Sequence, residues 1–407
     1  MEPKKSVCVV VPDLVGEAGG VTVLADFVFD TLRRSGRYQP TFMSLAVSSR
    51  DEASLRLLSP GSWRGGARAV SRERRGETHR HVGCHFAELE FQRYRPRAVL
   101  TDILNQYDVV HVVAGAPAWA LVAKGCRGVV VLHAATLVAS ERALVRRYAF
   151  PRWRYWMTRV TSHLDFAALR HVHLTFVINR WMKEAVGRVV GPSRVVFALP
   201  GVDTAHFRPD GYAENGYILS VGRFSDPRKD VRTLFRAYAL LRRAAPAAPK
   251  LVLAGLSMPT STDWEFAESQ GVAGFIEKRE GLSHSALAEL YRRACMFALS
   301  SVEEGLSLPV MEAMASGLPV ISTRCGGPET VVADGETGYL TPVRDAEAMA
   351  EKMRALLADA DSRRRMGARA RRIAEETFSL EMAGRAILEK YDELLSDVGG
   401  TSRRDGA

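Results

Sequence analysis

Residues 299–330 read LSSVEEGLSLPVMEAMASGLPVISTRCGGPET, and this stretch indicates the fold class of the chain. The apolar run Met296–Leu299 has the length of a buried strand, and Leu318–Ser322 has the composition of the next one. Between them, Pro309 suits the first turn of a helix, and Gly317 can end that helix in a left-handed conformation. The stretch therefore predicts one βαβ unit of a parallel sheet.

The polar residues of this unit are expected at one edge of the sheet, because ligands of open parallel sheets bind outside the carboxyl ends of the strands. These residues are Glu304, Gly305, Leu306, Ser307 and Glu312. The unpaired N–H groups at the start of the helix favour an anion such as phosphate, whereas the carboxylates suit the hydroxyls of a sugar or ribose. A solvated helix face is the alternative interpretation of the two glutamates.

A chain of 407 residues is too long for a single hydrophobic core of ordinary size, so we expect two domains. The composition is typical of a water-soluble enzyme. Hydrophobic residues make up 47% and charged residues 25% of the chain. The sequence has no apolar run of about 18 residues, so we expect no transmembrane helix. The N-terminal apolar run suits a buried strand better than a signal peptide, and we expect a cytoplasmic protein. The five cysteines include no CxxC pair, so neither disulfides nor a zinc site is indicated.

The net charge of +10 is concentrated in the first half of the chain. Residues 1–200 hold 29 Lys and Arg against 16 Asp and Glu, or +13, and the remainder holds 27 against 30, or −3. Within this half, the helical stretch Arg142–His171 combines arginines with aromatic residues, and it could lie on an anionic bilayer or line an acceptor groove. Ordinary packing with solvated arginines explains it too. We expect no nucleic acid partner and leave a peripheral membrane contact open; the oligomeric state is not legible.

Strands and helices alternate through the first half. The first strand leads into a glycine loop with Gly19 and Gly20, which can admit a phosphate or sugar close to the backbone or can merely turn the chain. His133 ends the strand Val129–His133, where a ligand contact and a core histidine are equally good interpretations. Residues 48–97 lack periodicity, which favours a basic surface loop over a metal site at their histidines.

The second half repeats the alternation, which indicates a parallel doubly wound sheet. A strand at Tyr217–Val221 leads into GRFSDPRKD, where Gly222 turns the chain and Arg223 and Lys229 bring two cations to the end of that strand. Such a pair can neutralise a diphosphate, since Arg offers a planar fork and Lys a point charge. A further strand is expected at Gly274–Ile276.

These motifs together resemble the retaining family 4 glycosyltransferases of GT-B architecture. EEGLSLPVMEAMASGLPVIS, followed by GGPETV and DGETGYL, is similar to the donor site of that family, and VGRFSDPRKD is similar to its diphosphate-binding segment. The resemblance implies an α/β fold with two doubly wound Rossmann-like domains that face each other across a cleft. Residues 1–200 would bind the acceptor, residues 201–378 would bind a nucleotide sugar, and a helix at 379–397 would dock back on the first domain.

The resemblance also implies roles for single residues. Arg223 and Lys229, beside Gly222, would bind the diphosphate and stabilise the negative charge that builds on it as the glycosidic bond breaks. The nucleotide sugar is then a co-substrate, and neither a metal nor a cofactor is required. Together with these cations, Glu304 and His133 are the residues implied to act in catalysis.

The remaining implied roles concern the two parts of the donor. Glu304 and the backbone of Gly305, Leu306 and Ser307 would hold the sugar hydroxyls, and Glu312 would take the ribose hydroxyls. Gly19 and Gly20 would approach the phosphate and sugar from the other domain, where His133 would touch the transferred sugar. Ile276 lies in the segment that pairs with the base through backbone atoms. Ser307 departs from the family, in which a second glycine is commoner.

The predicted function is hexosyl transfer from a UDP-sugar to a hydroxyl acceptor with retention of configuration. The acceptor could be a small metabolite or natural product, a glycan or a lipid. A nucleotide-sugar 2-epimerase, which is an isomerase without an acceptor, is one alternative, and a non-catalytic nucleotide-sugar binding protein is another. The presence of Arg223, Lys229, Glu304 and Glu312 as a set argues against the second alternative.

Overall fold

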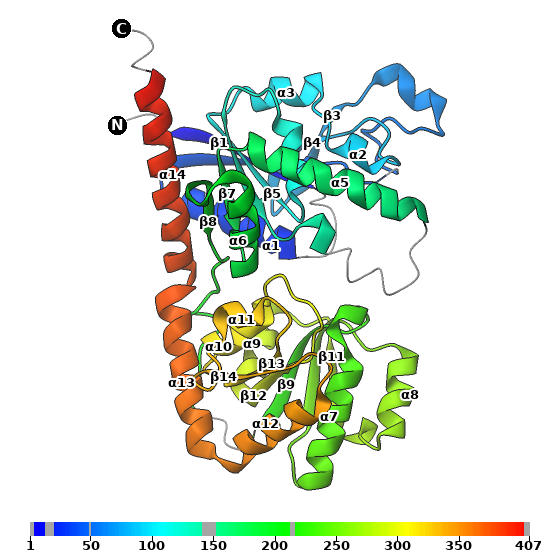
Figure 1. Cartoon of the computed structure of the whole chain (residues 1–407), viewed down its shortest axis with the longest axis vertical. Helices are drawn as coiled ribbons and strands as arrows, with labels where there is room; N and C mark the ends of the chain where they lie inside the picture. The colour runs from blue at the N-terminus through cyan, green and yellow to red at the C-terminus, as the bar shows by residue number, and fades with distance from the viewer. Residues whose placement is uncertain (1–3, 13–19, 49, 141–151, 212–215, 403–407) are drawn as a thin grey trace. The chain divides into compact units, whose positions relative to one another are not determined.

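The computed structural model describes residues 4–12, 20–48, 50–140, 152–211 and 216–402, and all of their side chains except those of 152–155 and 397–402 (Figure 1). The chain divides into two compact units. Met1–Pro200 and Gly384–Ala407 form the first unit, and Gly201–Ala383 forms the second.

The first unit is built on an eight-stranded sheet. Its strands are β1 Lys5–Pro12, β2 Tyr38–Leu45, β3 Ala69–Arg74, β4 Glu77–Val82, β5 Val109–Ala114, β6 Val129–Ala134, β7 Leu174–Val177 and β8 Val195–Phe197. They are arranged in the order β3-β4-β2-β1-β5-β6-β7-β8, and all neighbours are parallel except β3 and β4. Because β1, β5 and β6 are buried on both faces, their sequences are nearly continuous apolar runs.

Helices pack on this sheet and complete the core of the unit. They are α1 Gly20–Arg34, η1 Pro60–Gly65, α2 Glu90–Arg93, α3 Ala98–Leu104, η2 Pro117–Ala123, α5 Arg152–His171, α6 Arg180–Val190 and η3 Pro192–Arg194, where η is a 3-10 helix. Leu100, Trp119 and Leu169 from three of them join one hydrophobic cluster with Val112 and Leu132 of the sheet. This cluster packs the helices against the sheet.

Residues 48–97 are not the surface loop that the sequence led us to expect. They contain the antiparallel hairpin of β3 and β4, and β4 extends the sheet by pairing with β2. Most of β3 is exposed and charged, which hides this strand from a search for apolar periodicity. His79 and His81 of β4 are buried and lie 3.2 and 2.8 Å from Ser44 Oγ, so these two histidines serve packing. No group of His, Cys, Asp and Glu in the described residues is arranged to hold a metal.

The second unit has a six-stranded sheet in which every pair of neighbours is parallel, as predicted. Its strands are β9 Tyr217–Arg223, β10 Leu251–Ser257, β11 Ile276–Glu280, β12 Ala294–Leu299, β13 Val320–Thr323 and β14 Gly338–Thr341. The strand order is β11-β10-β9-β12-β13-β14, so the order reverses between β9 and β12. Such a reversal is where ligands bind in open α/β sheets.

The helices of the second unit include the short helix predicted between β12 and β13. They are η4 Pro227–Lys229, α7 Val231–Ala244, α8 Ser261–Ser269, η5 Ala273–Phe275, α9 His284–Arg293, α10 Leu308–Ala315, α11 Pro328–Val331, α12 Ala346–Ala358 and α13 Ala360–Thr377. Pro309 lies in the first turn of α10, and Gly317 follows the helix with φ +75°. The predicted βαβ unit is confirmed at this point.

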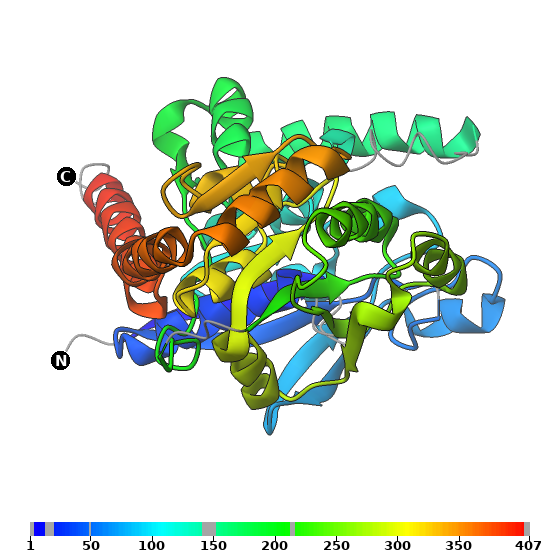
Figure 2. The same ribbon diagram turned by 90° about the horizontal axis from the view of Figure 1, so that it is seen from below.

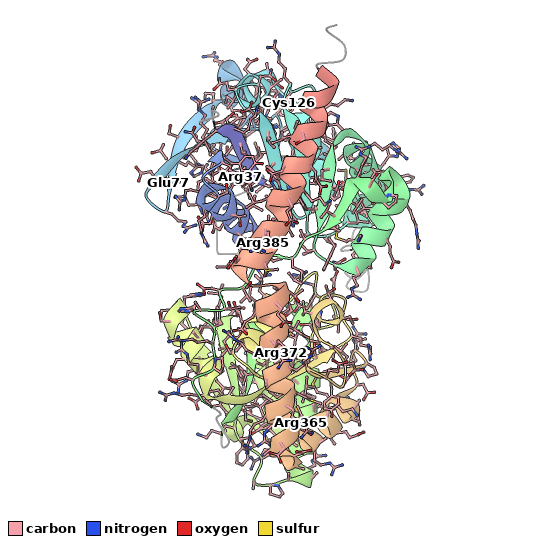
Figure 3. The ribbon with its side chains drawn as sticks, turned by 90° about the vertical axis from the view of Figure 1, so that its left-hand side faces the viewer. Arg37, Glu77, Cys126, Arg365, Arg372 and Arg385 are labelled. Atoms are coloured by element: carbon pink, nitrogen blue, oxygen red, sulfur yellow. The ribbon has the colours of Figure 1, made fainter. Side chains whose placement is uncertain are left out.

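The last helix, α14 Leu380–Ser402, groups with the first unit from Gly384 onward. Its Tyr391 is buried, and the Tyr391 hydroxyl lies 2.6 Å from His111 Nδ1. Asp392 accepts a hydrogen bond from Tyr38 at 2.8 Å and another from Arg37, which lies beside α14 in Figure 3. These contacts belong to the helix expected at 379–397. In the described part of the chain, no helix has the length and apolar content needed to cross a membrane.

Candidate functional site

Three loops meet at the carboxyl edge of the second sheet, after the neighbouring strands β9, β12 and β13. The N–H of Val302 donates to the carbonyl of Arg228 at 2.8 Å, which joins the loop after β12 to the loop after β9. The N–H of Glu304 donates to the carbonyl of Cys325 at 2.8 Å, which joins it to the loop after β13. The three loops therefore form one hydrogen-bonded platform.

Lys229 and Glu304 form an ion pair on this platform. Lys229 Nζ and Glu304 Oε1 are 2.5 Å apart, and their side chains are only 14% and 11% exposed. Ser301 Oγ donates a second hydrogen bond to the same oxygen at 2.7 Å. Because both charges are largely removed from water, the pair is screened less than a surface ion pair. A ligand with both an anionic group and hydroxyls would offer each partner a new contact.

Two arginines, one at the end of β9 and one in the loop after it, are held differently. Arg228 Nη2 donates to Asp226 Oδ2 at 2.7 Å. Burial raises the pKa of Asp226, but the hydrogen bonds from Arg228 outweigh this effect and lower the pKa below its usual value. Arg223, half exposed, lies 4.0 Å from the same carboxylate. Arg223 is thus the more loosely held cation, and it stands at the carboxyl end of β9 as predicted.

Glycines allow the loops to approach closely. A Cβ on Gly222 would be 3.5 Å from Lys229 Cε, so Gly222 leaves ordinary contact room for the lysine side chain. A Cβ on Gly255 would lie 1.8 Å from the carbonyl oxygen of Gly222, and one on Gly327 would lie 2.8 Å from Leu306 Cα. Only glycine fits at the last two positions. Sequence reasoning missed Gly255, whereas Gly327 belongs to the GGPETV motif.

The turn Gly305-Leu306-Ser307 leads directly into α10. Ser307 is the N-cap residue of α10, but its side chain makes no capping hydrogen bond. Its buried Oγ also has no hydrogen-bond partner among the described residues. Pro309 has no N–H, and the N–H groups of Val310 and Met311 donate to the Ser307 carbonyl at 3.1 and 3.2 Å. In the first turn of α10, the N–H of Leu308 is therefore the group that a ligand could use.

Glu312 lies one turn further along α10 and has a different partner. The hydroxyl of Tyr291, a fully buried residue of α9, donates to Glu312 Oε2 at 2.8 Å and reaches the carbonyl of Pro309 at 3.2 Å. Burial raises the pKa of Glu312 to about 7, although the hydrogen bond from Tyr291 acts in the opposite direction. Sequence reasoning missed Tyr291, since an aromatic residue at the end of an amphipathic helix is an ordinary core residue.

The position expected for Ile276 is wrong. The strand expected at 274–276 begins at Ile276 and runs to Glu280, in register with Leu251–Gly255 of β10. Ile276 therefore lies at the amino end of β11, away from the platform. Glu280 and the following Gly281 lie at the carboxyl end, beside Gly255.

The residues expected to contribute from the first unit are placed as follows. Gly19 lies outside the described residues. Gly20 begins α1, and a Cβ there would meet no atom within 4 Å. His133 lies near the carboxyl end of β6 but is fully buried against His111 and Phe176.

His133 has the environment of a core histidine. Its Nε2 lies 3.3 Å from the carbonyl oxygen of Ala198, so this nitrogen carries the proton because a carbonyl only accepts. Burial lowers the pKa of His133 to about 4. The imidazole is therefore neutral near pH 7.

Comparison with solved structures identifies the fold class. The chain is similar to sucrose-phosphate synthase from Thermosynechococcus elongatus, with a TM-score of 0.72 and 19% identity over 97% of this chain and 100% of that one. It is also similar to HepE of Anabaena in complex with UDP, with a TM-score of 0.68 and 15% identity over 95% of this chain and 100% of that one. The predicted GT-B fold of two Rossmann-like units is confirmed, and the cleft between them stays a prediction.

Sequence comparison then defines the family of the second unit. Residues 203–373 match the family described as glycosyl transferases group 1, so the chain carries a group 1 glycosyltransferase domain. A D-inositol 3-phosphate glycosyltransferase of Salinispora arenicola is 33% identical over 236 residues, which cover 52% of this chain and 52% of that protein. The chain thus spans about half the length of the curated relatives it matches. The matched segment includes the whole platform.

Proposed function

We propose that the chain transfers a hexosyl residue from a nucleoside diphosphate sugar to a hydroxyl acceptor with retention of anomeric configuration. The observation that carries this proposal is the Lys229–Glu304 pair next to the carboxyl end of β9. The cation suits the negative charge of a diphosphate. The carboxylate suits the hydroxyls of a sugar, and the glycine turn at the start of a helix lets the backbone approach the place where the sugar joins the phosphate.

In this proposal the bound donor separates the ion pair, and Lys229 and Glu304 each contact a different part of the donor. The diphosphate takes Lys229 and Arg223, and Glu304 with the backbone of Gly305–Ser307 accepts and donates hydrogen bonds at the sugar hydroxyls. Glu312 takes the ribose hydroxyls, and the base lies against the backbone at Glu280 and Gly281. Gly19, Gly20 and His133 remain proposed contacts of the transferred sugar, with His133 as a neutral hydrogen-bonding group.

The reaction follows from charge. The bond between the anomeric carbon and the phosphate oxygen breaks, the electron pair stays on the diphosphate, and the acceptor oxygen bonds to the same face of the sugar. The acceptor proton passes to the leaving phosphate oxygen. Arg223 and Lys229 stabilise the transition state more than the ground state, because negative charge grows on the diphosphate as the bond breaks. This assignment gives the two cations the task that a metal would otherwise perform.

The donor and acceptor are proposed at the level of class. A uridine diphosphate sugar is our first choice of donor, supported by the UDP in the similar HepE structure. The acceptor is a hydroxylated metabolite, glycan or lipid, and the similarity to a D-inositol 3-phosphate glycosyltransferase makes an anionic polyol the first acceptor to test. We propose the cytoplasm as the compartment, in line with the composition of the chain.

A donor-hydrolysis screen across UDP- and GDP-sugars tests the proposal, followed by an acceptor screen with the active donor. We expect release of the nucleoside diphosphate with one donor, and an α-linked product from an α-linked donor in the NMR spectrum. A donor that returns as its 2-epimer without any acceptor would replace the transferase by an isomerase. Absence of hydrolysis and transfer with every donor, despite measurable donor binding, would favour a non-catalytic binding protein.

A further inference from the structure

The outward face of α5 carries large apolar side chains that are exposed to solvent. Trp156 is 65% exposed, Val160 43% and Phe166 39%. At 100° per residue, these three positions lie within about 120° of one another around the helix axis, so they share one face. The opposite face holds the buried residues Thr161 and Asp165.

The same face is positively charged and has no acidic residue. Arg159 and Arg170 are exposed between the apolar side chains, and the Arg159 guanidinium lies 5.8 Å from the centre of the Trp156 ring. Asp165, the single carboxylate in the sequence of α5, is 2% exposed and accepts the N–H groups of Ala118 and Val138. Its charge is therefore turned away from this face.

The position of α5 leaves this face accessible to a large partner. Figure 2 shows α5 along the upper edge of the first unit, with the long axis of the helix parallel to that edge. A flat, extended partner can therefore lie along the helix.

We propose that the outward face of α5 docks the first unit onto an anionic lipid bilayer. Arginine and tryptophan side chains suit the headgroup level, where the ring is half buried and the cation meets lipid phosphate. The excess of 29 Lys and Arg over 16 Asp and Glu in residues 1–200 adds longer-range attraction. A second copy of the chain fits less well, because a symmetric α5 contact would bring arginines against arginines.

Co-sedimentation of the full chain with vesicles tests this surface. We expect binding to vesicles of phosphatidylcholine and phosphatidylglycerol in equal amounts, and weak binding to phosphatidylcholine alone or at high salt. Arg159→Ala with Arg170→Ala should lower the affinity roughly 30-fold, and Trp156→Ala about ten-fold. Absence of binding to the anionic vesicles at low salt would overturn the proposal.

Matched variants in the second unit separate this surface from general charge and hydrophobicity. Arg243→Glu on α7 changes the charge as Arg159→Glu does, and Phe275→Ala removes an exposed ring that, like Trp156, lies under an arginine. We expect both controls to bind like the wild type. Equal losses in Arg243→Glu and Arg159→Glu would reduce the effect to net charge and overturn the proposal.

A spectroscopic measurement keeps the proposal testable if the alanine variants unfold. Brominated lipids should quench the tryptophan fluorescence of the wild type more than that of Trp156→Phe, which retains an aromatic ring. Equal quenching in both proteins would show that Trp156 does not enter the bilayer. Self-association that Trp156→Phe abolishes, without any vesicle binding, would assign the face to a second copy instead.

Discussion

Glu304 and Glu312 lie eight positions apart on one loop and helix, yet the structure gives them opposite surroundings. Glu304 faces the ammonium of Lys229 at 2.5 Å. Glu312 faces the neutral phenol of Tyr291 at 2.8 Å, and burial raises its pKa to about 7. The difference teaches that two like residues in one motif can divide the work, because the first is balanced by a cation and the second changes charge near neutral pH.

The largest expected effect comes from removing the cation. Lys229→Ala should lower the rate of transfer roughly 10²-fold or more, since it deletes one electrostatic stabiliser and leaves Glu304 without its ion-pair partner. Lys352→Ala, which removes a half-exposed lysine of α12, is the control and should keep the wild-type rate. The measurement is kcat/KM with the active donor. Near-normal turnover of Lys229→Ala would remove the role assigned to this lysine.

The next effect concerns Glu312 and pH. A carboxylate accepts hydrogen bonds from ribose hydroxyls better than a neutral carboxyl group, so donor affinity should rise as the pH passes upward through about 7. Glu312→Gln should bind the donor roughly ten-fold more weakly at high pH and lose most of this pH dependence. Calorimetric donor binding across this pH range measures both. A pH profile that is the same in wild type and variant would assign the titration to another group.

Tyr291→Phe should move this profile by a smaller amount. The hydrogen bond from Tyr291 lowers the pKa of Glu312, so its loss should raise that pKa and shift the midpoint of donor binding to higher pH. At a pH well above the shifted midpoint, affinity should return to nearly that of the wild type, because Glu312 is then ionised in both proteins. A uniform loss of affinity at every pH would indicate a packing role for Tyr291 instead.

The smallest expected effect is on stability. The pKa of Glu312 is about 7 in the folded protein, compared with an ordinary 4.5. Its contribution to the free energy of unfolding is therefore fully present below pH 4.5 and is lost as the pH rises through about 7. Glu312→Gln stays neutral and escapes this loss. Its unfolding temperature should therefore improve relative to the wild type as the pH increases. A difference that does not change with pH would contradict the raised pKa.

Local sequence rules were sufficient for the elements around the site. Pro309 lies in the first turn of α10, and the helix ends before Gly317, as predicted. The fixed φ of proline and the positive φ of glycine determine helix ends through residues that are close in the sequence. The parallel order of strands followed from their alternation with helices. Residues 48–97 were misread because β3 and β4 form an edge hairpin that is mostly exposed, so hydrophobic periodicity is absent there.

Long-range partners were beyond those rules. Lys229 and Glu304 were both selected, but a contact between residues 75 positions apart requires the order of β9 and β12 in the sheet. Tyr291 carries no local mark of its bond to Glu312. Ile276 was misplaced because a shift of the strand boundary by a few residues moves a position from one end of a strand to the other.

Binding of the free nucleoside diphosphate tests the division of work between Lys229 and Glu304 most directly. This ligand has the phosphates of the donor but no sugar. Calorimetry should give Glu304→Ala an affinity equal to or above that of the wild type, because Lys229 is released for the phosphates, while Lys229→Ala binds at least ten-fold more weakly. If Glu304→Ala weakens diphosphate binding as much as Lys229→Ala does, the carboxylate does not serve the sugar alone, and the proposed exchange of partners is wrong.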